Sequence, residues 1–402
     1  MTAAWNRIPA SRTLGQAYTI VLEPGRWSAT QTPNYWQSRW GSASAPVELR
    51  AARAGSATLP AVNMFDVRWL RITGVRFRDR FDLFHCERCD HLTIDHSRFD
   101  GSQQLLDTVK FNQSTWIFLR HDRITGASQN ALQFVAVQHG AVTDSELAQS
   151  GDWCAYFKGG STDLTITGNR AHDCGTGGLL AGQGSGLQFM VAPFFRYEAY
   201  RMVIAGNWVW RTHGAGIGVN GGDQIALVNN CLWDTGAASH TVEIDFSLRT
   251  CDGHPGDPGR ERCAQYLSQG AWGTTRVDHG SNQVRIPNRD IVVAGNDRQP
   301  PPPGRRVARH PGAVRRPRPG RVRAGHRPHR RRAAHLRQPV RGGTRASGRH
   351  RQLPSRRLPS SPLSQHGHRA GEPVPRSCPG RPHAAQVLAT GADPHVRRQL
   401  TI

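Results

Sequence analysis

The chain has 402 residues, a formal net charge of +23 and a sequence pI near 11.2. A length of this order usually suggests two or three domains, and a strongly basic pI usually suggests nucleic-acid binding. The charge is unevenly distributed, however. Residues 297–402 contain 25 Arg, 17 Pro and only three acidic residues, so residues 1–296 are close to neutral. The overall pI therefore says nothing about the partners of residues 1–296. No apolar run approaches the ~20 residues of a membrane span, and we expect no membrane insertion.

Residues 297–402 form a non-globular Arg/Pro-rich tail in our interpretation. They lack aromatic residues altogether, and such a composition cannot offset chain entropy by burying a core. We favour a frameshift product, because GC-rich codons read out of frame yield mainly Arg, Pro, Gly, Ala and His. The alternatives are a natural disordered extension and an arm that neutralises phosphates. Nucleic acid is expected to bind only non-specifically, through this tail.

Residues 1–296 repeat a short apolar–x–apolar segment that is followed by Gly, Asn, Asp or Ser. Most copies are 22–25 residues apart. Alternation places the apolar side chains on one face of a strand, and such short strands are stable only when they stack at ~4.8 Å around a shared core. The sequence therefore predicts an all-β, right-handed parallel β-helix of about ten coils. The second apolar residues of the copies are Leu22, Leu49, Ile72, Ile94, Leu119, Val142, Ile166, Ile204, Leu227 and Val293.

The opening segment at residues 19–25 and the Gly-Asn pairs at 168–169, 206–207 and 295–296 resemble the parallel β-helix repeat of the pectin-lyase-like superfamily. The resemblance covers roughly residues 15–296. It implies the fold but no single activity, because the superfamily includes polysaccharide lyases, glycosidases, epimerases, tailspikes and adhesins.

Two intervals between copies are much longer than one coil, at residues 175–200 and 234–288. Insertions in a regular solenoid are common places for function. The first is rich in glycine and then in aromatic residues. We predict that Phe195, Tyr197 and Tyr200 are stacking surfaces for sugar rings, the alternative being an aromatic cluster that covers the core.

Residues 1–296 contain seven cysteines, from which we predict three disulfides. Cys251 and Cys263 would close a polar loop, which is worth about 3 kcal/mol. Cys154 and Cys174 are close to one coil apart and could stack on adjacent turns. Cys86 and Cys89 could be half of a zinc site, but no second pair accompanies them. Disulfides imply an oxidising compartment, so we expect a secreted or extracytoplasmic protein. Residues 1–14 have no signal-peptide core, so either the start is truncated, which we favour, or the protein is cytosolic with free thiols.

Only two lysines occur in the chain, Lys110 and Lys158, and each precedes a repeat strand by a similar distance. Lys158 aligns in phase with Asn220, and Gln133 and Glu243 occupy the neighbouring phase. We predict a polar stripe along one face. Its catalytic candidates are Lys158, His213, Arg196 and Glu198, its substrate-binding candidates are Asn112, Gln188, Asn220, Tyr197, Tyr200 and Phe195, and its metal candidates are Asp152 and Asp223.

Such a stripe suits the β-elimination of an acidic polysaccharide. A cation, either Ca²⁺ or a basic side chain, neutralises the uronate carboxylate while a base such as Lys removes the C5 proton. We therefore predict a secreted, monomeric, carbohydrate-active protein, most simply a polysaccharide lyase with Ca²⁺ as its candidate cofactor. A hydrolase would need two carboxylates about 5–10 Å apart, which Asp223, Glu243 or Asp245 could supply. The other alternative is a non-catalytic glycan-binding or adhesive β-helix.

Overall fold

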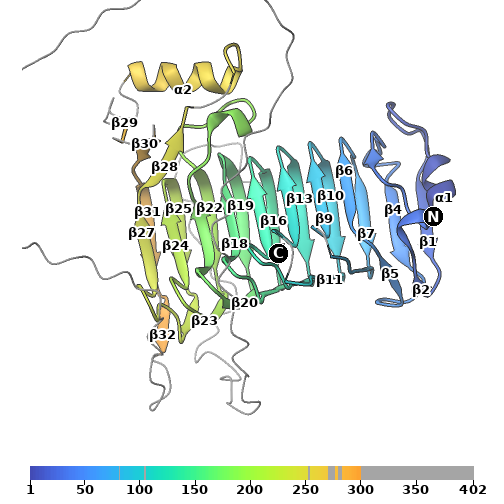
Figure 1. Ribbon diagram of the computed structural model, residues 1–402, viewed down its shortest axis with the longest axis horizontal. Helices are drawn as coiled ribbons and strands as arrows, with labels where there is room; N and C mark the ends of the chain where they lie inside the picture. The colour runs from blue at the N-terminus through green and yellow to red at the C-terminus, as the bar shows by residue number, and fades with distance from the viewer. Residues whose placement is uncertain (81, 104–105, 252–253, 270–276, 279–282, 300–402) are drawn as a thin grey trace, which may run out of the picture. The chain divides into compact units, whose positions relative to one another are not determined.

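The computed structural model describes residues 1–299 apart from 81, 104–105, 252–253, 270–276 and 279–282. Residues 300–402, and with them nearly all of the predicted tail, lie outside the described residues. Stacked strands occupy most of the described chain, as Figure 1 shows.

Three parallel sheets form the body, and each described coil contributes one strand to each of them, except the last, which has none in the third sheet. Sheets A and B have ten strands and sheet C has nine, which confirms the predicted parallel β-helix of about ten coils. Sheet A consists of β1 (Tyr18–Leu22), β4 (Val47–Ala51), β7 (Leu70–Thr73), β10 (Asp90–Asp95), β13 (Thr115–Arg120), β16 (Gln138–Thr143), β19 (Ser161–Thr167), β22 (Ala199–Ala205), β25 (Gly222–Val228) and β31 (Arg289–Ala294).

The strands of the other two sheets are shorter. Sheet B consists of β2 (Gly25–Arg26), β5 (Ala57–Leu59), β8 (Arg76–Phe77), β11 (Arg98–Asp100), β14 (Arg123–Thr125), β17 (Glu146–Ala148), β20 (Arg170–Cys174), β23 (Trp208–Thr212), β26 (Cys231–Trp233) and β32 (Asp297–Gln299). Sheet C consists of β3 (Trp36–Gln37), β6 (Val62–Phe65), β9 (Phe84–Glu87), β12 (Val109–Asn112), β15 (Leu132–Val135), β18 (Trp153–Lys158), β21 (Gly177–Gly182), β24 (Ile217–Asn220) and β27 (Val242–Asp245). Because β32 pairs with β26, the ladder reaches Gln299, three residues beyond the boundary expected from composition.

The predicted repeat residues from Leu49 to Val293 lie in one register along sheet A. The prediction was wrong for the first repeat residue, because Ile20 and not Leu22 pairs with Leu49. Both residues face the core, since they are two positions apart on one strand, and sequence alternation alone therefore could not choose between them.

A ladder of buried polar side chains explains the Gly-Asn pairs. At the turn between sheets A and B, the backbone N–H of each ladder residue donates to the side chain of its counterpart one coil later, as Asn169 does to Asn207 (3.0 Å) and Asn207 to Asn230 (3.0 Å). The residue before each Asn has positive φ, which Gly206 adopts without strain (φ 63°). Asn serves here because it accepts these hydrogen bonds and also donates to a carbonyl of the coil before.

The core is filled by stacked side chains, and one end of it is capped. Phe111, Phe134 and Phe157 follow one another along sheet C with ring centroids 5.4 Å apart. At the N-terminal end, helix α1 (Thr2–Asn6) places Trp5 against Trp36 at 4.6 Å, and Trp5 is almost fully buried. The first coil is therefore closed off from solvent.

The two long insertions pack on each other and form one small unit, which we call the roof (the described parts of 183–198 and 246–286). It contains the 3-10 helix η2 (Leu187–Phe189), helix α2 (Pro258–Ser268) and an antiparallel sheet of β28 (Ser247–Thr250), β30 (Gln283–Ile286) and β29 (Val277–Asp278). A separate 3-10 turn, η1 (Ala29–Gln31), lies near the N-terminus. The roof has its own apolar cluster, which includes Leu187, Met190, Cys263, Tyr266, Val284 and Ile286.

The prediction that six cysteines form three disulfides is confirmed, and the structure gives the pairing that the sequence left open. Cys86–Cys89, Cys154–Cys174 and Cys251–Cys263 are disulfides, and the last of them ties α2 to the end of β28 within the roof. Among the described residues, no helix is long and apolar enough to cross a membrane.

Candidate functional site

The outward face of sheet C carries two parallel columns of side chains. Strand pairing places Glu87, Asn112, Val135 and Lys158 in one column. It places His85, Lys110, Gln133 and Tyr156 in the other. The two columns share one face because their residues are two apart on each strand, and this face points away from the core. The regular stacking therefore brings together residues that are dozens of positions apart in the chain.

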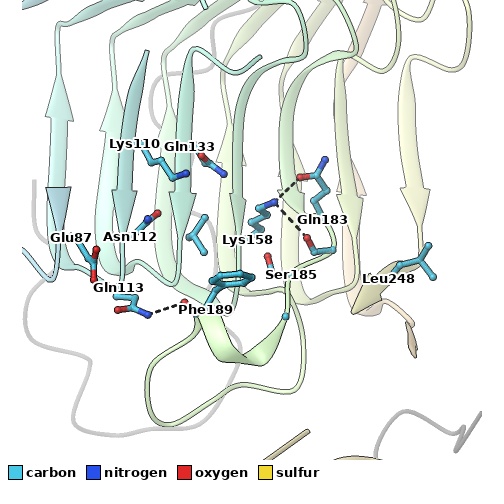
Figure 2. A pocket seen from close by; sticks show the side chains of 13 residues that line it. Glu87, Lys110, Asn112, Gln113, Gln133, Lys158, Gln183, Ser185, Phe189 and Leu248 are labelled. Carbon is cyan, nitrogen blue, oxygen red and sulfur yellow. Dashed lines mark hydrogen bonds between the residues drawn. The ribbon is translucent and has the colours of Figure 1, made fainter. Parts of the chain in front are cut away.

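These columns and the roof enclose a hollow of about 720 Å³, which we call the groove (Figure 2). Sheet C supplies its floor, while the chain after β21 and the start of β28 supply one wall. The lining residues are Glu87, Lys110, Asn112, Gln113, Gln133, Val135, Lys158, Gln183, Gly184, Ser185, Gly186, Phe189 and Leu248. Both lysines of the chain are among them.

Lys158 lies in the middle of the groove and faces the roof (Figure 2). Its Nζ donates to Oε1 of Gln183 (3.2 Å) and to the carbonyl of Gly184 (3.5 Å), and it stands 4.6 Å from the ring centroid of Tyr156. Both acceptors are uncharged. Burial lowers the pKa of Lys158, and the nearby Lys110 lowers it further, whereas Glu198 and Asp107 act in the opposite direction. The amine is therefore easier to deprotonate than an ordinary lysine.

Lys110 lies in the neighbouring column and keeps an ionic partner. Its Nζ is 3.8 Å from Oδ2 of Asp107, whose carboxyl pKa is raised mainly by burial. Beside it, Nε2 of Gln133 donates to the hydroxyl of Tyr156. Burial is also the main cause that raises the pKa of Tyr156, so the phenol stays protonated. The groove floor thus holds one cation with a partner, and a neutral phenol lies beside Lys158 just outside the lining.

Next to the groove, the side chain of His85 links those of Asn112 and Asn63 by hydrogen bonds. Nδ2 of Asn112 lies 3.3 Å from Nε2 of His85, and Nδ1 of His85 lies 3.1 Å from Oδ1 of Asn63. Burial and Lys110 lower the pKa of His85. These contacts fit a neutral imidazole that is protonated on Nδ1 and accepts on Nε2, and they orient the Asn112 amide.

The predicted stripe is partly reproduced. Asn112 and Lys158 lie in the groove, and Asn220 continues their column, but its Nδ2 donates to Oε1 of Glu243 outside the groove lining. Gln188 does not lie in the column. It belongs to η2, because the first insertion leaves sheet C after Gly182 and folds into the roof.

A second hollow, of about 390 Å³, gathers another part of the predicted set. Its lining residues are Pro193, Phe195, Arg196, Tyr197, Tyr200, Asp223, Tyr266 and Arg289. Tyr200, Asp223 and Arg289 are paired across β22, β25 and β31, so this hollow is on the sheet A side. The residues predicted as sugar-stacking surfaces therefore do not share a site with Lys158.

Three further predicted residues, like Asn220 and Gln188, line neither hollow. Glu198 is completely buried, where it pairs with Arg249 at 2.8 Å and accepts a hydrogen bond from the backbone N–H of Gly159 at 2.9 Å. His213 is exposed in the turn after β23, and Asp152 directly precedes β18. The contacts of Glu198 join the two insertions to sheet C, which is an architectural role.

The arrangement of possible metal ligands differs from the prediction. Within the described part of the chain, the group that converges is Asp95, His96 and His121 at the turn after β10 and β13, with their ligand atoms within 4.8 Å of one another. Asp152 and Asp223 belong to no such group. The guanidinium of Arg120 acts electrostatically on Asp95, which disfavours a further cation there.

Several lining residues were missed. Glu87 could have been found, since it is the partner of Asn112 one coil earlier. Gln183, Ser185, Phe189 and Leu248 could not, because they come from insertions that do not follow the repeat and whose path depends on how the roof packs.

Comparisons with known proteins give likenesses of fold. No family model and no curated protein sequence matches the chain. Among solved structures, the A-module of mannuronan C-5 epimerase AlgE6 from Azotobacter vinelandii matches 71% of this chain and 78% of its own, at 10% identity and a TM-score of 0.45. Pectate lyase Pel9A matches 61% and 68% at 12% identity and a TM-score of 0.34. The surface adhesin PfbA of Streptococcus pneumoniae matches 61% and 83% at 10% identity and a TM-score of 0.35. At these identities none of the three says what this chain does.

Proposed function

We propose that the groove binds a uronate-containing polysaccharide and that Lys158 removes the C5 proton to begin a β-elimination. One observation carries the proposal: the only two lysines of a chain with 52 basic residues line the same groove. Arginine is always protonated, whereas lysine can act as a base when burial lowers its pKa. Lys158 has that lowered pKa and, among the described residues, only uncharged hydrogen-bond acceptors.

The remaining groups fit the needs of the reaction. Lys110 would face the uronate carboxylate and stabilise the negative charge that develops when the C5 proton leaves. Glu87 is the one carboxylate among the described lining residues, which is fewer than the six to eight oxygen ligands that Ca²⁺ takes. We therefore assign charge neutralisation to Lys110. The amides of Asn112, Gln113 and Gln183 can bind sugar hydroxyls.

In the proposed step, the C5 proton is removed and the glycosidic bond at C4 is broken within the groove. The neutral amine of Lys158 takes the C5 proton, the electron pair of the C5–H bond forms the C4–C5 double bond, and the C4–O bond of the glycosidic linkage breaks. The departing oxygen takes a proton, which the newly formed ammonium of Lys158 or solvent supplies. The products are a shortened chain and a chain that begins with an unsaturated uronate.

The three disulfides between described residues support a place outside the cytoplasm, because disulfides persist in oxidising compartments. A polysaccharide substrate would be met in the same setting.

The second candidate function is glycan binding without catalysis. It is favoured by the amide-rich lining and by Phe189, which is 56% exposed at the edge of the groove and offers a stacking surface. The same groove would then serve as an adhesive site.

Ultraviolet absorbance of unsaturated uronates separates these functions. On a panel of alginate, pectate and glycosaminoglycans, the wild-type chain should release the unsaturated product from at least one polymer. Lys158→Arg keeps the positive charge but not the base, and should lose about 10²–10⁴-fold in kcat. Lys110→Arg is the matched control and should retain most of the activity.

Two other outcomes are informative. Incorporation of solvent deuterium at C5 without an unsaturated product would mean that the proton is returned to carbon, as in epimerisation. Polymer binding that weakens in Lys158→Arg, with neither product nor deuterium incorporation from any polymer, would replace the lyase with the adhesive function.

A further inference from the structure

We propose that the second hollow, on the sheet A side of the roof, is a separate sugar-binding site that recognises two neighbouring hydroxyl groups of a sugar residue. The proposal goes beyond the groove and does not require Lys158 to be catalytic. It rests on a buried carboxylate with one oxygen that has no hydrogen-bond partner among the described residues, an aromatic wall and two flanking arginines in one cavity.

The aromatic wall consists of rings that hold one another in place. Tyr200 lies 4.8 Å from Phe195 and 5.4 Å from Tyr197, measured between ring centroids. Tyr197 is 8% exposed, while Phe195 and Tyr200 remain half-buried and line the cavity. The hydroxyl of Tyr266 donates to the carbonyl of Phe194 at 2.8 Å and fixes α2 against this wall. Rigid aromatic faces beside a few polar groups are typical of sites for small organic ligands.

Asp223 supplies the polar centre. It is 4% exposed, and its Oδ1 has no hydrogen-bond partner among the residues that the structure describes. The nearest cationic group is Nε of Arg289, at 3.7 Å from Oδ1. A buried carboxylate oxygen without a hydrogen bond is costly, and such positions in a native fold call for an explanation. Sugar hydroxyls that donate to Asp223 would provide the missing bonds.

Two arginines at the rim of the second hollow can donate hydrogen bonds to the sugar hydroxyls. Arg289 extends from β31 beside Asp223 and is 60% exposed, and its Nε also lies 3.1 Å from Oδ2 of Asp290. Arg196 lies 5.2 Å from the ring centroid of Tyr266. A carboxylate that accepts and guanidinium groups that donate can grip two adjacent hydroxyls, while the rings pack on the apolar face of the sugar.

The hollow is distinct from the groove although the same insertion lines both. From this insertion, the groove lining takes residues 183–186 and Phe189, whereas the second hollow takes residues 193, 195–197 and 200. Sheet C carries Lys158, whereas sheet A carries Tyr200, Asp223 and Arg289. Substitutions at the two places can therefore be tested separately.

Isothermal titration calorimetry of the full chain tests the proposal. The probes are mannotriose, cellotriose, trimannuronate and trigalacturonate, so neutral and acidic sugars are compared directly. Asp223→Asn and Arg289→Gln should each weaken binding of at least one trisaccharide by about tenfold, the usual scale for losing a hydrogen bond to a charged group. The matched controls Asp144→Asn and Arg71→Gln alter exposed residues elsewhere and should bind as the wild type does.

The result is readable whether or not the groove is catalytic, because mannotriose and cellotriose carry no uronate to eliminate and their binding is measured without turnover. Lys158→Gln should leave the affinity for the neutral probes mannotriose and cellotriose unchanged, because the groove is proposed to bind uronates. The proposal is overturned if no trisaccharide binds the wild type, or if Asp223→Asn and Arg289→Gln bind as tightly as it does while their thermal unfolding shows an intact fold. A loss of binding confined to Lys158→Gln would place the sugar in the groove alone and overturn the proposal as well.

Discussion

At the scale of single residues, the groove depends on how two lysines influence each other. Lys158 has lost much of its hydration and, within the described part of the chain, hydrogen-bonds only to Gln183 and the Gly184 carbonyl, whereas Lys110 keeps Asp107 as a partner. Burial is the largest cause of the lowered pKa of Lys158, and the charge of Lys110 adds to it. The two side chains are therefore suited to different tasks, one as a base and one as a fixed cation.

This difference predicts a pH dependence. If Lys158 is the base, kcat/KM rises with pH as its amine loses the proton, and that limb lies below the ordinary lysine range. Lys110→Gln removes a positive charge that lowers the pKa of Lys158, so the limb should move to higher pH. The measurement is a pH–rate profile of both proteins. A limb that stays in place in Lys110→Gln would mean that another group titrates.

Asp122 gives a prediction for stability. It occupies a position of the buried ladder where later coils use Asn, and it accepts hydrogen bonds from the backbone N–H groups of Ser97 (2.7 Å) and Arg120 (3.2 Å). Burial raises its pKa from 3.8 to about 8. A carboxyl with a raised folded-state pKa stabilises the fold fully below its unfolded pKa, and this contribution is lost as pH rises through the folded value.

Asp122→Asn should therefore raise Tm, and the gain should grow between pH of about 4 and about 8. At pH 8 we expect at least about 2 °C, measured by thermal unfolding at a series of pH values. Asp144→Asn, at the next turn but exposed, is the control and should show no such trend. An equal effect of Asp122→Asn at every pH would show that the carboxyl does not titrate in this range.

At the scale of elements, the strands could be predicted and the roof could not. The alternation and the Gly-Asn pairs predict the strands and the turns between them. Each of these positions packs against the equivalent positions of the coils before and after it, which restricts the residue types that fit. Ile166 and Ile204 are examples. The path of the insertions instead depends on contacts such as Glu198 with Arg249, 51 residues apart and outside any repeat. For this reason Lys158 and Asn112 were found, whereas Gln183 and Phe189 were not.

Substitutions in the Glu198–Arg249 pair test whether the roof can loosen independently of the β-helix. Both side chains are fully buried, and removing one partner of a buried pair typically costs 3–5 kcal/mol because a charge is left unpaired. Arg249→Met should loosen the roof, seen as faster hydrogen exchange in β28 and η2, while strands of sheet B remain protected. Glu198→Gln combined with Arg249→Met removes both charges and should recover part of the protection. Uniform loss of protection in all three sheets would contradict a separate roof.

At the scale of the whole molecule, the two ends of the described solenoid differ. Trp5 and Trp36 close the N-terminal coil. At the other end, Val293 and Ile244 occupy core positions, paired with the fully buried Leu227 and Val219, yet are 46% and 47% exposed. Stacked strands with unpaired edges and apolar side chains are templates for association. The sequence indicates these positions as core, but their exposure depends on whether another coil stacks on them.

A chain that ends at Gln299 should therefore associate through its last coil. We expect its apparent mass by light scattering to rise with concentration, and Val293→Lys to reduce that rise, because a charge at a core position would have to be buried between the two molecules. Val292→Lys is the matched control: Val292 is the neighbouring residue on β31, is 54% exposed, and points to the opposite face, so its substitution should change association less. Association that falls equally in both variants would assign the contact to the outer face of sheet A, and a chain that stays monomeric at all concentrations would show that the last coil is not a docking edge.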